Sequence, residues 1–171
     1  MITYNPAFDL YHSIFRLAHI LRKMEQQRRY EIDYVRIWDF YMLYPVQLLH
    51  VLLKVDEKEL REARKLLRLK ETSYDYKGDI RKLFEWIKPF QLSALGCLVS
   101  CGILDKEAYE LGYVEVENPY LLDSFIEKAG DISVHEKNVL NFLSFLFSGM
   151  SLTGAYGMKH RTKLMESKYD A

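Results

Sequence analysis

Apolar residues recur at intervals of three or four along most of the chain, which predicts a mainly α-helical fold. The N-terminal helix shows this most clearly, because Asn5 suits an N-cap and Pro6 suits the first helical position. We expect this helix to span residues 6–26. Its apolar face carries Phe8, Tyr11, Ile14, Phe15, Ala18, Leu21 and Met24, and its other face carries Asp9, His12, Arg16, His19 and Lys23.

The remaining helices differ in how apolar they are. The segment 31–54 is apolar nearly all round, which places it in the middle of the fold, and Pro45 should kink or split it. The segment 56–70 is densely charged, as expected of a solvated helix. Two further helices are expected at 79–88, which Pro89 ends, and at 91–101, which Gly102 closes. A short helix is expected at 106–111. The last two are expected at 119–129, after Asn118, and at 133–147, which the capping box Ser133-x-x-Glu136 begins.

Short strands complete the predicted secondary structure. Residues 113–117 alternate and predict a strand, and Tyr74–Tyr76 is the natural candidate for its partner. The order of elements over 79–117 resembles part of a winged helix-turn-helix, and plain α+β packing is the other interpretation. The expected fold class is mainly α with a minor α+β component. We expect one compact helical domain over residues 1–171, with one or two short strands and a polar C-terminal tail at 150–171.

Composition excludes some classes of protein. The 171 residues are 49% hydrophobic, which suits a folded globule and excludes a disordered or low-complexity chain. The 24 Lys and Arg residues equal the 24 Asp and Glu residues in number, so the formal net charge is zero. This balance argues against a uniformly basic nucleic-acid-binding protein.

The charges are nevertheless segregated along the sequence. Residues 1–30 carry a net charge of +3, the stretch 105–136 carries −7, and the last 21 residues carry +2. The acidic stretch would repel DNA and suits a basic protein partner. A second interpretation of the basic residues is that they form a solvated surface. The first is that five of them contact DNA phosphates: Arg28, Arg29, Lys159, Arg161 and Lys163.

Motifs that carry chemistry are not found in the sequence. It contains no G-x-S-x-G, P-loop or G-x-G-x-x-G motif, and its five histidines do not form a metalloprotease pattern. Cys97 and Cys101 suit small buried apolar residues better than half of a zinc site. We therefore expect a non-enzyme with no cofactor and no metal. Neither a signal peptide nor a membrane span is predicted, so we expect a cytoplasmic protein with no membrane partner.

Arg36 and Asp39 stand out because both lie within an apolar segment. Burying either charge alone would be costly, so the two form an internal pair or contact a partner. On the N-terminal helix, Asp9, His12 and Arg16 form a polar stripe that suits contact with a partner.

Three motifs resemble those of a known family: Y-N-P-A-F-D at 4–9, R-I-W-D-F-Y at 36–41 and R-T-K-L-M-E-S-K-Y-D at 161–170. Together they are similar to a middle component of bacterial ABC three-component conflict systems, which include the Lamassu type. The resemblance implies a small non-catalytic subunit, encoded with an SMC/Rad50-like ABC ATPase and with an effector such as a nuclease. Several such components carry helix-turn-helix-like cores.

Two hypotheses of function follow. The first is an adaptor that bridges the ATPase and the effector in an antiphage or antiplasmid defence complex. Its expected partner interface comprises Tyr4, Asn5, Asp9, His12, Arg16, Arg36 and Asp39. The second is a free-standing winged helix-turn-helix regulator that binds DNA.

Overall fold

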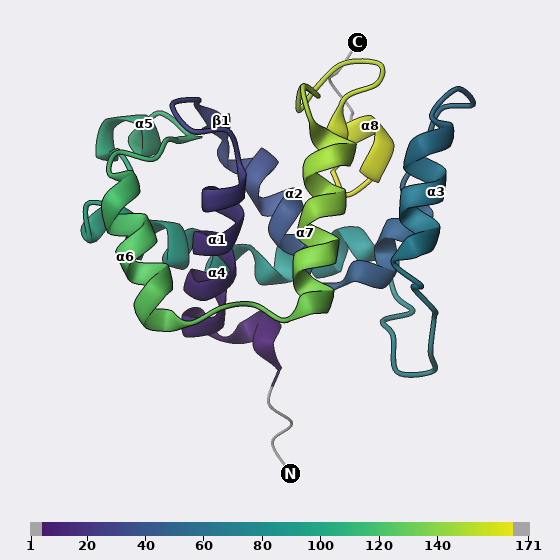
Figure 1. Ribbon diagram of the computed structural model, residues 1–171, viewed down its shortest axis with the longest axis horizontal. Helices are drawn as coiled ribbons and strands as arrows, with labels where there is room; N and C mark the ends of the chain where they lie inside the picture. The colour runs from purple at the N-terminus through teal and green to yellow at the C-terminus, as the bar shows by residue number, and fades with distance from the viewer. Residues whose placement is uncertain (1–4, 166–171) are drawn as a thin grey trace. The chain divides into compact units, whose positions relative to one another are not determined.

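The computed structural model describes residues 5–165 (Figure 1). Its helices are α1 (Leu10–Lys23), α2 (Ile32–Leu43), α3 (Lys58–Leu66), α4 (Ile80–Ser100), α5 (Lys106–Glu110), α6 (Pro119–Ala129), α7 (Val134–Phe147) and α8 (Met158–Thr162). The short 3-10 helices η1 (Pro6–Phe8) and η2 (Pro45–His50) and the strands β1 (Tyr30–Glu31) and β2 (Tyr113–Val114) complete it. The prediction of a mainly α fold with short strands is confirmed.

By its internal contacts the chain divides into two compact units. The first unit comprises Met1–Asp39 and Trp86–Ile132, and the second comprises Phe40–Glu85 and Ser133–Ala171. The boundaries fall within α2, within α4 and just before α7. The prediction of one domain over 1–171 stays a prediction, and each unit is described by itself.

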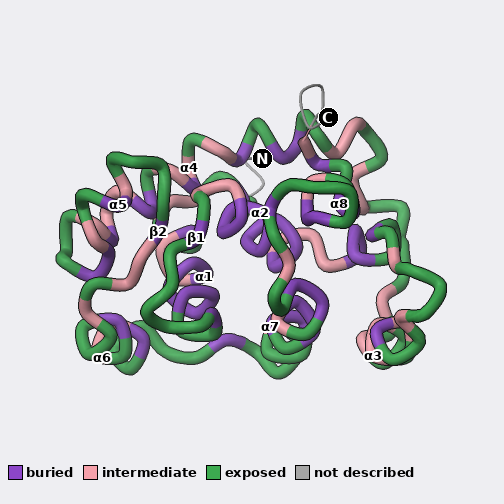
Figure 2. The backbone as a smooth tube through the Cα atoms, turned by 90° about the horizontal axis from the view of Figure 1, so that it is seen from above, coloured by how far each residue is buried: buried purple, intermediate pink, exposed green. Residues whose placement is uncertain are grey.

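In the first unit, α1 packs against α6, and the two helices lie side by side in Figure 1. β1 and β2 pair antiparallel, with Tyr30 opposite Val114. An isolated bridge between Leu104 and Val116 lies next to this pairing in sequence. Buried residues come from α1, α2, α4 and α6 and include Leu17, Ile37, Leu95 and Ile126. Figure 2 shows the buried side of α1 and α6 and their exposed outer sides.

In the second unit, α3 packs against α7. The rings of Tyr41 and Phe147 lie 6.3 Å apart, and those of Phe40 and Phe84 lie 5.7 Å apart. Tyr41 is almost fully buried, which raises the pKa of its phenol well above the usual value. The described part of the predicted polar tail includes α8, whose Met158 is also buried.

Prolines and caps set the helix ends largely as the sequence predicts. Pro45 separates α2 from η2, Asn118 caps α6, and Ser133 and Glu136 form a capping box at the start of α7. Pro89 differs from the prediction, because it lies inside a continuous α4 and does not end a helix. Buried apolar residues on both sides of it favour continuation of the helix despite the lost N–H.

The strand predicted at Tyr74–Tyr76 is wrong. This segment is a turn, in which the Asp75 carboxylate accepts hydrogen bonds from the backbone N–H and the hydroxyl of Thr72. β2 pairs instead with β1, which comes from a distant part of the sequence. The two-stranded wing expected for the 79–117 segment therefore does not form from the predicted partners.

Candidate functional site

Two successive caps determine how the chain enters the first unit. The Asn5 side chain accepts a hydrogen bond from the Ala7 backbone N–H and caps η1. The Asp9 side chain then accepts one from the His12 backbone N–H and caps α1. The predicted helix over 6–26 is therefore broken at Asp9, which has extended backbone angles. This break places Phe8 just before α1 and Tyr11 in its first turn.

Exposed aromatic side chains occur on three elements of the first unit, η1, α1 and α4. Phe8 is 40% exposed, Tyr11 is 82% exposed, and Trp86 of α4 is 55% exposed. The rings of Phe8 and Phe90 lie 5.6 Å apart in an edge-on arrangement, which joins η1 to α4. Trp86 lies one helical turn before Phe90, on the same side of α4. We call these four residues the aromatic surface.

Exposed aromatic residues of this kind are typical of protein interfaces. Trp and Tyr are enriched among the residues that carry most of the binding free energy, because they bury a large area with few rotatable bonds. His12 is also exposed and lies next to Tyr11. The sequence missed Phe8 and Tyr11 as surface residues because their helical spacing placed them on the apolar face.

A buried polar network lies in the same unit. The Asp39 carboxylate accepts hydrogen bonds from Arg16 Nε at 2.9 Å and from Gln91 Nε2 at 2.9 Å. Arg36 Nε donates to Gln91 Oε1 at 2.9 Å, and Arg36 Nη1 donates to the Asp33 carboxylate at 2.6 Å. Arg36, Asp39 and Gln91 are fully buried, and Arg16 is nearly so. We call these five residues the buried network.

The buried network joins three helices of the first unit and the entry to α1. Arg16 belongs to α1, Asp39 and Arg36 to α2, and Gln91 to α4. Arg16 also donates to the Pro6 carbonyl oxygen at 3.2 Å, so the network reaches η1. On α2, Arg36 pairs with Asp33 and is linked to Asp39 through Gln91, whereas the cation that pairs with Asp39 is Arg16. Buried charges are tolerated here because their hydrogen-bonding groups find partners.

The predicted interface residues therefore have different environments. Asn5 and His12 are exposed and Asp9 is half-buried, whereas Arg16, Arg36 and Asp39 belong to the buried network. Tyr4 lies outside the described residues. Direct contact of this set with a partner stays a prediction.

The polar face predicted for the N-terminal helix also differs from the structure. His19 is buried, and its Nε2 lies 3.1 Å from the Gly130 carbonyl oxygen. Arg16 and His19 are thus buried, whereas Tyr11 is exposed. Their partners are distant in sequence, so the spacing of residues within the helix gave no sign of this arrangement.

The model of one protein family matches residues 2–170 and is described as ABC-three component (ABC-3C) system Middle Component 5. The chain belongs to this family. No curated protein and no solved structure matches the chain. Membership in a three-component system implies co-encoded partner components, and a middle component is consistent with an adaptor.

In this middle component, the basic residues predicted to contact DNA in the first unit already have acidic or aromatic neighbours. Arg29 Nε lies 2.5 Å from the Glu115 carboxylate, whose hydrogen bond and charge raise the pKa of Arg29. The Arg28 guanidinium lies 5.1 Å from the ring centre of Tyr30 and 3.6 Å from Glu25. The acidic stretch thus neutralises part of the basic N-terminal segment.

The basic residues predicted to contact DNA in the second unit differ in burial and in ion pairing. Arg161 is buried and donates two hydrogen bonds to the Glu57 carboxylate, at 2.7 and 2.8 Å. This bidentate contact lowers the pKa of Glu57. Lys163 is exposed and Lys159 is half-buried. Contact of any of the five basic residues with phosphate stays a prediction.

Between residues 5 and 165, no three His, Cys, Asp or Glu side chains are grouped so that they could hold a metal ion. Within the same range, every helix is too short or too polar to cross a membrane.

Proposed function

We propose that this middle component is a non-catalytic adaptor that bridges an SMC-like ABC ATPase and an effector, such as a nuclease, in a defence complex of the Lamassu-like type. The observation that carries the proposal is the family match over residues 2–170, which extends over nearly the whole chain. The resemblance of its three motifs to such components supports the same function.

The aromatic surface is the region that we propose contacts a partner. Its three exposed residues come from η1, α1 and α4, and the Phe8–Phe90 contact holds η1 against α4. The exposed polar residues Asn5 and His12 lie at the same end of α1 and would supply the polar rim of the contact. The buried network would act from inside, by fixing η1 and α4 beneath that surface.

Co-expression with the co-encoded genes tests this function. The tagged full-length chain should co-purify with the ATPase and with the effector, and the three proteins should be recovered in a fixed molar ratio. The chain alone should show neither ATPase nor nuclease activity. Recovery of the chain without either partner, or hydrolysis of ATP or DNA by the purified chain alone, would contradict the proposal.

A further inference from the structure

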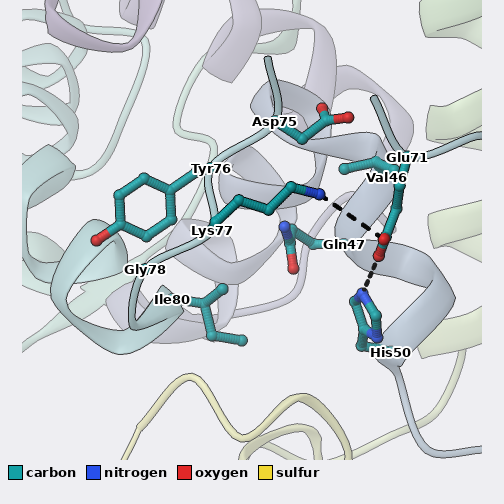
Figure 3. A pocket seen from close by; sticks show the side chains of 9 residues that line it. All are labelled: Val46, Gln47, His50, Glu71, Asp75, Tyr76, Lys77, Gly78 and Ile80. Atoms are coloured by element: carbon teal, nitrogen blue, oxygen red, sulfur yellow. Dashed lines mark hydrogen bonds and ion pairs between the residues drawn. The ribbon is translucent and has the colours of Figure 1, made fainter. Parts of the chain in front are cut away.

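A pocket of about 280 Å³ lies in the second unit, lined in part by Asp75 and Tyr76 of the turn (Figure 3). Residues of η2, of the segment 71–78 and of the start of α4 form its walls. Val46 and Ile80 give it apolar walls, and the Tyr76 ring lies beside Gly78. The volume lies just below the range of about 300–1,000 Å³ that is usual for ligand pockets, so it suits a small ligand.

Gln47 is the unusual residue of this pocket. Nine polar or charged side chains are buried among residues 5–165, and eight of them have hydrogen-bond partners. Gln47 is the ninth: the residue is only 7% exposed, its carboxamide has no hydrogen-bond partner among the described residues, and the polar atoms of that carboxamide remain open to the pocket. Figure 3 shows that the carboxamide points into the pocket, between Ile80 on one side and His50 and Glu71 on the other.

The Gln47 amide is available to a ligand. Because its polar atoms are open to the pocket, a ligand that enters can replace water as their hydrogen-bond partner. A primary amide offers a donor and an acceptor side by side, so the ligand that it selects has a complementary acceptor and donor on one edge.

The rim of the pocket restricts the charge of that ligand. The Glu71 carboxylate lies 2.8 Å from His50 Nε2 and 3.8 Å from Lys77 Nζ. Asp75 adds a second carboxylate, and its hydrogen bonds from Thr72 lower its pKa, so it stays ionised at neutral pH. Two carboxylates against one lysine disfavour a ligand with several negative charges.

We propose that this pocket binds a nucleoside through its base, and that adenine is the base whose edge pairs with Gln47. Adenine presents the N6 amino donor next to the N7 acceptor, and glutamine pairs with this edge in a bidentate manner. The apolar side chains of Val46 and Ile80 would contact the flat faces of the base. This site does not depend on the aromatic surface, so failure of either proposal leaves the other standing.

Calorimetric titration of the full-length protein tests the ligand. Adenosine is expected to bind saturably, guanosine and uridine at least tenfold more weakly, and ATP at least tenfold more weakly than adenosine because its phosphates meet the two carboxylates. No saturable binding of adenosine at millimolar concentration would overturn the proposal. Equal binding of all three nucleosides would overturn the role of Gln47.

A variant separates ligand binding from stability. Gln47→Leu removes the amide at nearly constant volume, so it should weaken adenosine binding at least tenfold and leave the Tm of the unliganded protein within about 2 °C of the wild type. A lower Tm together with unchanged adenosine binding in Gln47→Leu would show that the amide is structural and overturn the proposal.

Gln91→Leu is the matched control, because it makes the same substitution at a buried glutamine that does not line the pocket. The Gln91 amide has partners in Arg36 and Asp39, so this variant should have a lower Tm. Measured well below that Tm, it should bind adenosine as the wild type does. Equal weakening of adenosine binding in both variants would show that loss of any buried amide disturbs the protein, and would overturn the assignment of Gln47.

Discussion

Two buried glutamines show how the units of this protein differ. Gln91 in the first unit is bonded to Arg36 and Asp39 and completes a network of charges, whereas Gln47 in the second unit has no such partner and faces a pocket. Both side chains are buried, so the two residues differ in whether the side-chain amide is hydrogen-bonded within the protein. A buried amide that is bonded within the fold stabilises it, whereas we propose that the amide facing the pocket binds a ligand.

The largest effect is expected from the anion of the buried network. Asp39→Ala leaves Arg16 without its carboxylate in a buried environment, which should lower the free energy of unfolding by about 3–5 kcal/mol. Urea unfolding of the purified variant measures this loss. A loss below about 1 kcal/mol would show that the network contributes little.

Gln91→Leu should follow with a smaller loss. The substitution leaves groups of Arg36 and Asp39 without a partner, which we expect to cost about 2–3 kcal/mol in the free energy of unfolding. The same urea titration measures it. An unchanged or increased free energy of unfolding would remove the contrast with Gln47.

Glu57→Gln tests the ion pair of the second unit. Arg161 holds the pKa of Glu57 below its ordinary value of 4.5, so the pair stabilises the fold fully above that value and loses its contribution as the pH falls through the lowered pKa. We expect Glu57→Gln to lose about 1 kcal/mol at pH 7, because the carboxylate is partly exposed.

The pH dependence supplies the control for this prediction. The difference in unfolding free energy between wild type and Glu57→Gln should shrink in urea titrations as the pH falls below the ordinary pKa of 4.5. A difference that stays constant from neutral pH to well below that value would contradict the assigned cause.

The smallest effect is expected at Gln47. Gln47→Leu should change the free energy of unfolding of the unliganded protein by less than about 0.5 kcal/mol, because its amide makes no hydrogen bond within the described residues and is open to the pocket. Urea unfolding of this variant and of Gln91→Leu under the same conditions measures the difference. An equal loss of stability in both variants would show that both amides stabilise the fold.

Local features of the structure could be predicted from the sequence where the signal itself is local. Asn118 and the Ser133–Glu136 capping box mark the starts of α6 and α7, and Pro45 marks the end of α2. Features that depend on distant partners could not. The partner of Arg16 is Asp39, 23 residues away, and β2 pairs with a strand far earlier in the chain.

The candidate sites were predictable only in part. Arg36 and Asp39 were recognised because a charge within an apolar segment requires a partner. Gln91 and Gln47 have no distinguishing local pattern, and the exposure of Tyr11 follows from the extended backbone at Asp9, which the regular apolar spacing hid.

We propose that the aromatic surface binds a co-encoded partner, and that the buried network beneath it does not contact that partner directly. The most direct measurement is co-purification of the tagged full-length chain with the co-encoded ATPase and effector, for wild type, for Tyr11→Ala combined with Trp86→Ala, and for Tyr120→Ala. Tyr120 is the matched control, because it is 87% exposed in the same unit but lies on α6. We expect at least tenfold less partner to be recovered with the double variant, and unchanged recovery with Tyr120→Ala. Full recovery of both partners with a folded double variant would show that the aromatic surface does not bind them.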